Sequence, residues 1–479
     1  MKITQLYVYP IKALRPIPLP HAQLTPQGIK YDRTFMLYHV KTKADGSGSV
    51  ELKKMQLSSY PQCALFEQTI LSREDGSKEV LVKWHAPAPA GAGAEGTTGS
   101  QGDEQAEREK LKRLEAETIT VELDPPPRIE ELHKVEVDLH GSPTTCYKVG
   151  EAYDRWFSER FGFEVVFVYL GDGKRQILGT SLLPPPPTAT TSTHNSHASS
   201  RRQSGQSTPQ RQQHPQQHEQ SGGGGGWQST LTSLVSWFQP TVPISVPGFI
   251  AIQGERQDQN DHMQDQQQQN MKPWITFTDV APLLITSESS LSNLSARLLA
   301  PESTSTSTES TESTTESTTH PPQVPMYKMR PNLVLDGEGE EAWAEDYWGE
   351  LVVTSTSSSF TPTDSSTSTS SSKKTKTKLH LTGNCARCTS LNVDYDTGKP
   401  AKGEMGTVLK KLMKDRRVDP GMKWSPVFGR YAFVGESVGE GQGEEQEQEE
   451  EEREVWISVG DEVQVTRRNE ERTVMDWPF

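Results

Sequence analysis

Apolar residues are scarce in this chain, and the shortage is concentrated in certain stretches. Hydrophobic types make up 32% of its 479 residues, and the mean hydropathy is -0.69. A globular chain usually has a larger apolar share. Long polar tracts dilute an otherwise ordinary core, so we expect the folded part of the chain to be shorter than its full length.

Cysteine is rare as well, and long apolar runs are missing. Four cysteines are too few for a secreted disulfide scaffold of this size, which favours a reducing compartment. No apolar run reaches the roughly 18 residues that a membrane span needs. The opening, MKITQLYVYPIK, has neither a signal-peptide nor a transit-peptide pattern. We therefore expect a cytoplasmic protein without a transmembrane segment.

A surplus of positive charge is also missing. The 49 Lys and Arg residues face 64 Asp and Glu residues, which gives a net charge of -15. Nucleic-acid binders normally present a basic face, so we expect no nucleic-acid partner. Much of the negative excess lies in EGQGEEQEQEEEERE at 440–454. Such a run is typical of a solvated loop, and an acidic docking site for a partner is the more specific alternative.

Six stretches are expected to be disordered low-complexity insertions. Each lacks the apolar residues that would offset the entropy of ordering, and a long loop adds little closure entropy. The stretches are residues 88–113, 181–226, 254–271, 301–323, 354–376 and 435–453. They leave one folded body of about 320 residues.

The remaining segments are mostly short and rich in β-branched and aromatic residues. Examples are ITQLYVYP, RTFMLYHV, EVVFVYL and VWISVGDEVQV, each bounded by turn residues. Helical periodicity occurs only at 150–162, 287–299 and 406–417. This pattern predicts a mainly β fold with accessory helices and β-barrel architecture.

The stretch GNCARCTSLNVDYDTGKP carries two of the cysteines, Cys385 and Cys388. A structural zinc site would need two further Cys or His ligands, and Cys63 and Cys146 stand alone and far apart. A thioredoxin-type pair expects a helix after the cysteines, whereas a strand and a turn are predicted here. Two alternatives remain open, which are plain buried cysteines or one thiolate for a soft metal that brings its other ligands.

Polar residues at strand ends favour the single-thiolate alternative. Lys12 follows a strand in YPIKAL, and Arg33 precedes one in GIKYDRTFML. Arg330 and Asn332 begin another in YKMRPNLVLDG, and Asp279 lies in FTDVAP. Ligand groups often collect at such positions, although each residue alone is most often a surface charge. Three cations beside one cysteine would form an anion cradle.

In chain order, seven segments resemble the MOSC family. They are LYVYPIKAL, GIKYDRTFML, FTDVAPLLITSESSLSNLSARL, MRPNLVLDG, EDYW, GNCARCTSLNVDYDTG and SPVFGRYAFV. The family includes the C-terminal domain of molybdenum cofactor sulfurase and the mitochondrial amidoxime-reducing component. The resemblance implies a MOSC N-terminal β-barrel module at 1–150, connecting helix and strand segments at 151–180 and 227–253, and a MOSC β-barrel domain at 272–470.

The resemblance implies a bound molybdenum–molybdopterin cofactor and a set of residues that hold it. Cys388 is then the protein ligand to molybdenum, and Lys12 and Arg33 hold the cofactor phosphate. The resemblance also implies that Arg330 and Asn332 line the pterin site and that Asp279 lies close to the metal.

Two departures from the family pattern bear on these assignments. Ala13 stands where a serine commonly follows the lysine, and Val280 and Ala281 replace a small hydroxylated pair after the aspartate. The resemblance assigns no role to Cys385, for which a packed core thiol is the plain expectation.

The implied activity is the two-electron reduction of N-hydroxylated substrates with release of water. Electrons would come from an external carrier such as a b-type cytochrome and its reductase, because the chain shows no GxGxxG fingerprint after a strand. Animal relatives of this type carry an N-terminal membrane anchor, whereas this chain starts at the first predicted strand, so we expect a cytoplasmic protein and keep mitochondrial association as the alternative.

Two other functions remain open. In the first, the chain is a sulfur or cofactor carrier, and Cys388 holds a persulfide or the cofactor for transfer, as resemblance to the sulfurase C-terminal domain allows. The pyridoxal-phosphate domain of the sulfurase is missing here, so pyridoxal phosphate binding would reflect family membership alone. In the second, the chain is a non-catalytic scaffold whose acidic and Ser/Thr-rich loops bind partners.

Overall fold

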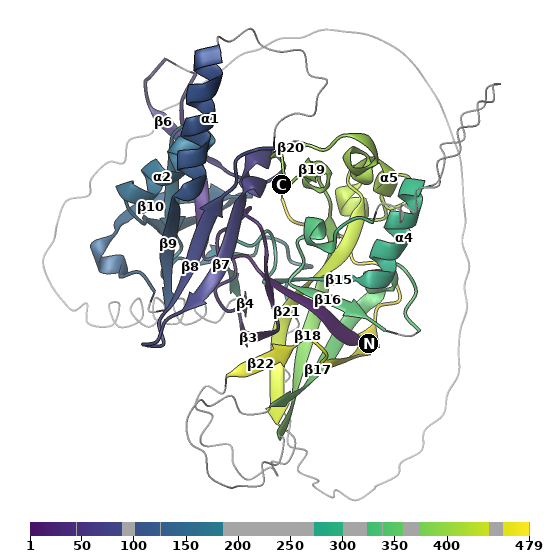
Figure 1. The fold of residues 1–479 in the computed structure, drawn as a ribbon. Helices are drawn as coiled ribbons and strands as arrows, with labels where there is room; N and C mark the ends of the chain where they lie inside the picture. The colour runs from purple at the N-terminus through teal and green to yellow at the C-terminus, as the bar shows by residue number, and fades with distance from the viewer. Residues whose placement is uncertain are drawn as a thin grey trace, which may run out of the picture. The chain divides into compact units, whose positions relative to one another are not determined.

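The computed structural model describes residues 1–44, 46–88, 101–124, 126–184, 273–299, 323–337, 339–357, 373–439 and 454–478. Contacts divide the chain into two units, Met1–Pro185 with Lys272–Phe479, and Pro186–Met271. All described residues belong to the first unit. Its early and late segments fold together, and its elements are drawn in Figure 1.

The largest sheet of the described residues closes on itself as a seven-stranded barrel. Every neighbouring pair is antiparallel except β15 with β16, which is parallel. Around the ring, the strands are β16 (Leu333–Asp336), β15 (Leu283–Ser287), β21 (Val427–Gly439), β18 (Lys373–Ala386), β17 (Trp348–Ser357), β23 (Glu462–Arg468) and β1 (Lys2–Val8). The prediction of a mainly β fold with barrel architecture is confirmed.

Strand β1 closes this barrel although it begins the chain. Ile3 pairs with Leu335 on one side, and Lys2 pairs with Glu462 on the other. Ile3, Leu6 and Val8 are buried and join the core, which is why the strand lies inside the barrel wall. The predicted division between 1–150 and 272–470 therefore separates segments that share one sheet. Strand β2 (Ile17–Leu19) extends β1.

The N-terminal module contributes two further sheets. The five-stranded sheet has the order β10 (His133–Leu139), β11 (Ser142–Lys148), β12 (Val165–Tyr169), β5 (Phe35–Thr42) and β6 (Val50–Lys54). The three-stranded sheet has the order β7 (Phe66–Ser72), β8 (Lys78–Trp84) and β9 (Thr118–Asp124). Helix α2 (Glu151–Phe161) packs the aromatic ring of Phe161 on Phe66, at 4.7 Å between ring centroids, and so joins the two sheets.

Small sheets complete the described fold. Strand β22 (Val455–Ser458) pairs with β3 (His21–Thr25), which pairs with β4 (Gly28–Ile29), so late and early segments meet again. The other pairs are β13 (Arg175–Gln176) with β14 (Trp274–Ile275), and β19 (Val393–Asp394) with β20 (Lys399–Pro400).

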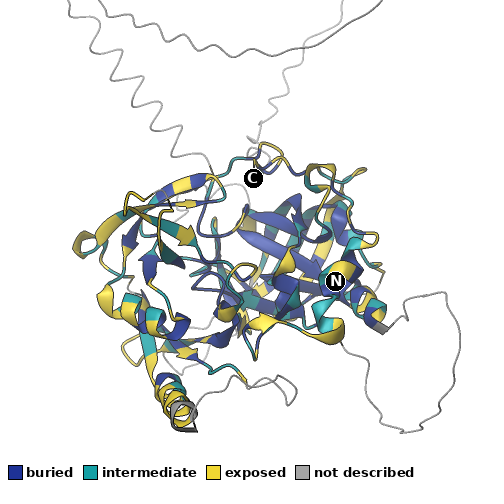
Figure 2. Cartoon of the chain, turned by 90° about the horizontal axis from the view of Figure 1, so that it is seen from above, coloured by how far each residue is buried: buried dark blue, intermediate teal, exposed yellow. Residues whose placement is uncertain are grey.

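Two helices lie beside the barrel and bury leucines against each other. Leu294 of α4 (Glu288–Leu299) and Leu412 of α5 (Val408–Met413) are fully buried in one apolar cluster. Helix α5 is shorter than the predicted 406–417, because Arg416 turns inward to bond Asp346. In Figure 2 the barrel strands are mostly buried, whereas one side of the helices faces solvent.

Helix α1 (Gln101–Ala116) corrects the predicted insertion at 88–113. Leu114 is 2% exposed, and Leu111 packs against the same core. Arg160 of α2 donates through Nη2 to the Leu114 carbonyl oxygen at 2.7 Å. Two apolar residues on an otherwise charged helix are thus enough to dock its C-terminal end.

Barrel strands also run into two other predicted insertions. Strands β17 and β18 pair as far as Ser357 with Lys373, inside 354–376, and β21 continues to Gly439, inside 435–453. Cross-strand pairing extends them because β-branched and polar residues are tolerated at the solvated end of a hairpin. Apart from 181–184 and 323, the other predicted insertions and the segment 227–253 lie outside the described residues.

Among the helices of the described residues, none combines the length and the apolar character needed to cross a bilayer.

Candidate functional site

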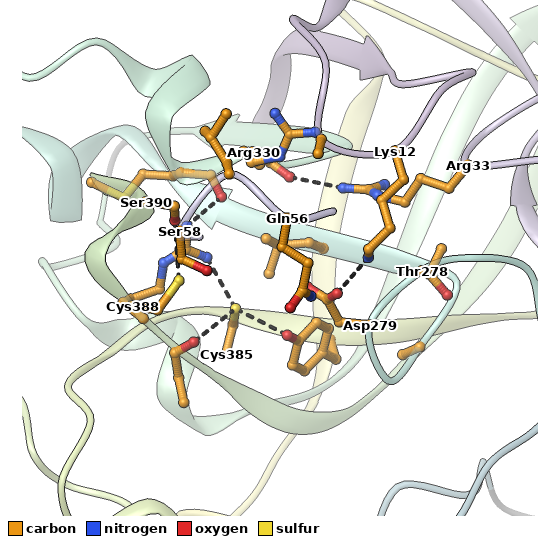
Figure 3. Close-up of a pocket in the computed structure, with 18 of the residues that line it drawn as sticks. Lys12, Arg33, Gln56, Ser58, Thr278, Asp279, Arg330, Cys385, Cys388 and Ser390 are labelled. Atoms are coloured by element: carbon orange, nitrogen blue, oxygen red, sulfur yellow. Dashed lines mark hydrogen bonds and ion pairs between the residues drawn. The ribbon is translucent and has the colours of Figure 1, made fainter. Parts of the chain in front are cut away.

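A pocket lies where early segments of the chain meet the barrel, and it brings together all six predicted site residues. Its walls come from loops after β1 and β4, from the segment before β15, and from the end of β18. Figure 3 shows Lys12 turned toward Asp279 on one side of the site, and Cys388 beside Ser390 on the other. The predicted residues that line it are Lys12, Arg33, Asp279, Arg330, Asn332 and Cys388.

Two arginines share one aromatic ring at the base of the site. The guanidinium carbons of Arg33 and Arg330 each lie 4.4 Å from the centre of the Tyr9 ring. Both arginines have left-handed backbone, with φ of 52° and 53°. Tyr9 is fully buried and donates to the Pro331 carbonyl oxygen at 3.0 Å. The ring keeps two like charges close by cation–π attraction to both.

The positive charge of Arg33 is balanced by the carboxylate of Asp32. Its Nη1 bonds the Asp32 carboxylate, and Nη2 donates to the Arg330 carbonyl oxygen at 3.3 Å. Burial lowers the pKa of Arg33, but Asp32, Tyr9 and Asp279 together outweigh burial and raise that pKa. Arg33 therefore stays charged at the base of the pocket.

Lys12 and Asp279 form an ion pair on the pocket wall. Lys12 Nζ lies 2.5 Å from Asp279 Oδ1. Lys12 is 6% exposed, and burial lowers its pKa to about 8 although Asp279 opposes the shift. The Asp279 side chain is 49% exposed, because it lines the open pocket, and many protein atoms nevertheless lie around it. Burial raises the pKa of Asp279, but Lys12 and then His140 hold it well below its ordinary range.

Asn332 is committed to the fold. Its Oδ1 accepts from the Leu284 backbone N–H at 3.1 Å and from Arg33 Nη1 at 3.3 Å, while Nδ2 donates to the Tyr7 carbonyl oxygen at 3.3 Å. These bonds join β1, β15 and the start of β16. The residue lines the pocket, but most of its hydrogen-bonding capacity shapes the pocket wall.

The two cysteines differ in environment. Cys388 is exposed and its Sγ lies 3.2 Å from Ser390 Oγ. Cys385 is buried, with Sγ 3.2 Å from Tyr431 Oη and 3.0 Å from Arg387 Nη1. The Cys385 thiol is packed, as expected, but it also has polar partners.

The segment around the cysteines departs from the sequence expectation in its secondary structure. The predicted strand after Cys388 begins with a 3-10 turn, Thr389–Asn392, before the short strand β19. Arg387 is buried and donates through Nη2 to the Met329 carbonyl oxygen at 2.8 Å. In the described part of the chain, no group of three or more His, Cys, Asp or Glu residues could hold a metal ion.

Sequence reasoning missed several residues at the site. Tyr9, Tyr431 and Arg387 belong to motifs that were recognised, but nothing in the motifs indicated stacking or burial. His140 contacts Asp279 from a distant hairpin. Its signal was the pair His-Gly between two alternating segments, which is typical of a tight turn and says nothing about what the turn touches.

The residues present fit an anionic group that carries a soft metal. Lys12, Arg33 and Arg330 supply positive charge to the pocket that the exposed thiol of Cys388 also lines. Among the described residues that line the pocket, Thr278 Oγ1, Arg330 Nη2 and Arg387 Nε are buried without a hydrogen-bond partner. Buried donors in a native structure are normally satisfied, so this group of donors is consistent with a ligand that carries acceptor oxygens.

Comparison with protein families matches this chain in two parts. The MOSC N-terminal beta barrel domain matches residues 1–164, and the MOSC domain matches residues 272–464. These ends differ by 14 and 6 residues from the predicted ends at 150 and 470.

One similar curated protein is mitochondrial amidoxime-reducing component 1 of Homo sapiens. It is 29% identical over 172 residues, which are 35% of this chain and 36% of the relative. This chain therefore matches about a third of that protein's length. On the two domain matches, and with the barrel described above, the chain belongs to the MOSC family.

Proposed function

We propose that the pocket binds molybdenum–molybdopterin and that the protein reduces N-hydroxylated compounds. The observation that carries this proposal is that Lys12, Arg33 and Arg330 line the same pocket as the exposed thiol of Cys388. The name of the similar human protein supports amidoxime-type substrates, although the matched stretch is short.

The cations are suited to the phosphate of the cofactor. Charge-assisted bonds from Lys and Arg to phosphate oxygens are stronger than neutral ones. Lys12 and the partner-free Nη2 of Arg330 supply such donors, and Thr278 Oγ1 adds a neutral one. A phosphate that takes the Lys12 ammonium as a partner also offsets the burial that lowers its pKa.

Cys388 is the proposed ligand to molybdenum. The thiolate is the metal-binding form of cysteine, and nearby positive charge stabilises it. Ser390 Oγ is within hydrogen-bond distance of Sγ, so it can fix the direction of the sulfur. When bound, the cofactor supplies the two-electron redox chemistry.

Asp279 is proposed to bind the substrate. Its lowered pKa keeps the carboxylate ionised at neutral pH, so it accepts hydrogen bonds from the substrate and does not donate a proton. N-hydroxylated amidines and amines carry N–H groups that suit this acceptor. Asp279 is the only acidic residue among the described residues that line the pocket.

Electrons are proposed to come from an external carrier such as a b-type cytochrome and its reductase. The reduction consumes two electrons and two protons for each N–O bond broken, and it releases one water. The location of the protein remains a proposal as well. We propose the cytoplasm, and the similar human protein is mitochondrial by name.

The substitution Cys388→Ala tests this proposal. We expect the variant to fold, to lose bound molybdenum, and to lose reduction of an N-hydroxylated test compound. Thr389→Ala is the matched control, because Thr389 is the exposed neighbour outside the pocket lining. The measurements are metal content, circular dichroism and turnover with an artificial electron donor. Full turnover in Cys388→Ala would sink the assignment.

A sulfur or cofactor carrier is the second candidate, and one observation favours it. Cys388 is exposed at the pocket, where a persulfide sulfur would be reachable. Incubation with a cysteine desulfurase and labelled cysteine tests this function, and it predicts label that is lost in Cys388→Ala. A non-catalytic scaffold is the third candidate, and it predicts that neither metal nor sulfur is bound.

A further inference from the structure

His140 reaches the pocket from a hairpin whose backbone geometry does not favour a histidine. Strands β10 and β11 are joined by two residues, His140 and Gly141, and Leu139 pairs with Ser142 across the turn. Both turn residues are left-handed, with φ of 61° and 76°. Two-residue turns of this kind prefer Asn-Gly, so asparagine would suit the backbone better. Turn geometry therefore does not explain the histidine.

The imidazole of His140 is held on both ring nitrogens. Nε2 lies 3.3 Å from Asp279 Oδ1 and 3.0 Å from the amide nitrogen Nε2 of Gln56. Nδ1 lies 3.4 Å from Lys54 Nζ. The C-terminal segment also fixes the turn, because Trp477 Nε1 donates to the His140 carbonyl oxygen at 2.8 Å.

Two of these neighbours select the same tautomer independently. A carboxylate can only accept, so the contact with Asp279 requires a proton on Nε2. A lysine ammonium can only donate, so the contact with Lys54 requires a lone pair on Nδ1. Gln56 has its amide nitrogen against this ring nitrogen, and a donor there would require a lone pair on Nε2. The tautomer selected by Asp279 and Lys54 therefore requires the Gln56 amide to be turned over, so that its oxygen accepts from Nε2; the two amide orientations have the same shape. His140 is thus neutral, with its proton on Nε2.

His140 and Lys12 contact the same oxygen of Asp279. Lys12 Nζ and His140 Nε2 both lie against Oδ1. The Asp279 side chain is half exposed and lines the pocket, so both contacts hold a carboxylate that a pocket ligand can reach. If an anionic group in the pocket takes Lys12 as its partner, His140 is the donor that still holds the carboxylate in place.

The charged groups around His140 come from three segments. They are Lys54 at the end of β6, Lys12 after β1, and Asp279 before β15. Burial lowers the pKa of His140, Asp279 opposes this, and both lysines add to the lowering. Near neutral pH the ring is therefore uncharged, in agreement with the hydrogen-bond pattern.

We propose that His140 is a positioning residue that orients the Asp279 carboxylate toward substrate through an Nε2–H bond. The inference rests on the proposed function for the part that Asp279 plays with substrate. The geometry itself, a histidine of the N-terminal module bonded to an acid of the barrel side of the pocket, stands without that function.

His140→Asn separates this role from folding. Asparagine is favoured in the turn but is too short to reach Asp279, so thermal stability should be retained or raised. Molybdenum content should not change, whereas kcat/KM for an N-hydroxylated substrate should fall by about tenfold, as is usual when a supporting hydrogen bond at a metal site is lost. His133→Asn, at an exposed position on the same hairpin, is the matched control.

The pH profile distinguishes positioning from a merely structural role. In the natural protein, kcat/KM should decline as the pH falls through the pKa of His140, because the charged ring competes with substrate for Asp279. That decline should be missing in His140→Asn. Equal kcat/KM and equal pH profiles in the two proteins would overturn the proposal.

A spectroscopic readout tests the geometry even if the proposed activity fails. Nitrogen-15 NMR of the histidine rings should show His140 neutral and protonated on Nε2 near neutral pH. The substitution Asp279→Asn should lower the pKa of His140 further, because the carboxylate raises it. An Nδ1–H tautomer, or an unmoved pKa, contradicts the proposal. If the natural protein holds no molybdenum, the proposed function fails and this measurement alone decides the inference.

Discussion

At the scale of one residue, the buried ammonium of Lys12 gives the pocket a positive charge and lowers the stability of the fold. The folded protein lowers its pKa from 10.5 to about 8, chiefly by burial. Between these values the unfolded chain binds more protons than the folded protein, so stability should rise with pH across that range. At lower pH the buried ammonium destabilises the fold. Functional sites often carry such a local cost.

Replacing Lys12 with methionine should therefore stabilise the protein that holds no ligand. We expect a gain of about 1–3 kcal/mol near pH 7, which should shrink as the pH approaches about 10. Urea denaturation at several pH values measures it. The same variant should lose molybdenum, and Lys53→Met, at an exposed position on β6, is the control. A destabilised Lys12→Met at pH 7 would show that the ion pair with Asp279 outweighs burial.

Single residues of the site could be predicted only in part. Lys12, Arg33 and Cys388 lie in segments whose resemblance to the MOSC family is visible in the sequence. The sequence could not show that the Tyr9 ring contacts two guanidinium groups. It also could not show that the Asn332 side chain makes hydrogen bonds to the backbone. Both facts depend on chains of contacts between segments more than 300 positions apart.

At the scale of elements, helix α1 is the clearest difference between expectation and structure. Its sequence, QGDEQAEREKLKRLEA, is charged almost throughout and has little apolar periodicity. Leu114 nevertheless reaches the core, and the helix ends where Arg160 bonds its last turn. Whether such a marginal helix forms depends on the tertiary packing of one or two side chains, and the local amino-acid composition does not reveal that packing. The predicted strands lacked this problem, because alternation marks each of them directly.

Leu114→Ala tests whether α1 is docked. Leucine-to-alanine changes at buried positions cost about 2–5 kcal/mol, and we expect the lower half of that range because the helix lies at the edge of the core. Urea denaturation gives the value, and Lys112→Ala, at an exposed position on the same helix, should change stability by less than about 0.5 kcal/mol. Equal stabilities for the two variants would mean that the helix does not pack on the core.

At the scale of the described molecule, the two predicted domains are tied by shared sheets. Strand β1 closes the C-terminal barrel, and β22 completes a sheet with β3. The resemblance placed the domains in the correct order along the chain, but strand pairing over such separations has no local signal. The pocket lies where the two meet, which is why its residues come from both.

This arrangement predicts one cooperative unfolding transition. Leu6 of β1 is 1% exposed, so Leu6→Ala should cost about 2–5 kcal/mol and shift the transitions of both modules together. Hydrogen exchange reports them separately, at Val82 in β8 and at Leu381 in β18. Lys2→Ala, at an exposed position on the same strand, is the control. Two separate transitions would contradict the coupling.

The most direct test of the whole account is the molybdenum content of the protein purified from a host that makes molybdopterin. The account predicts about one molybdenum atom per chain, and almost none in Cys388→Ala under the same conditions. A folded natural protein without molybdenum would contradict the account. Sulfur transfer would then be the next role to test for the thiol of Cys388.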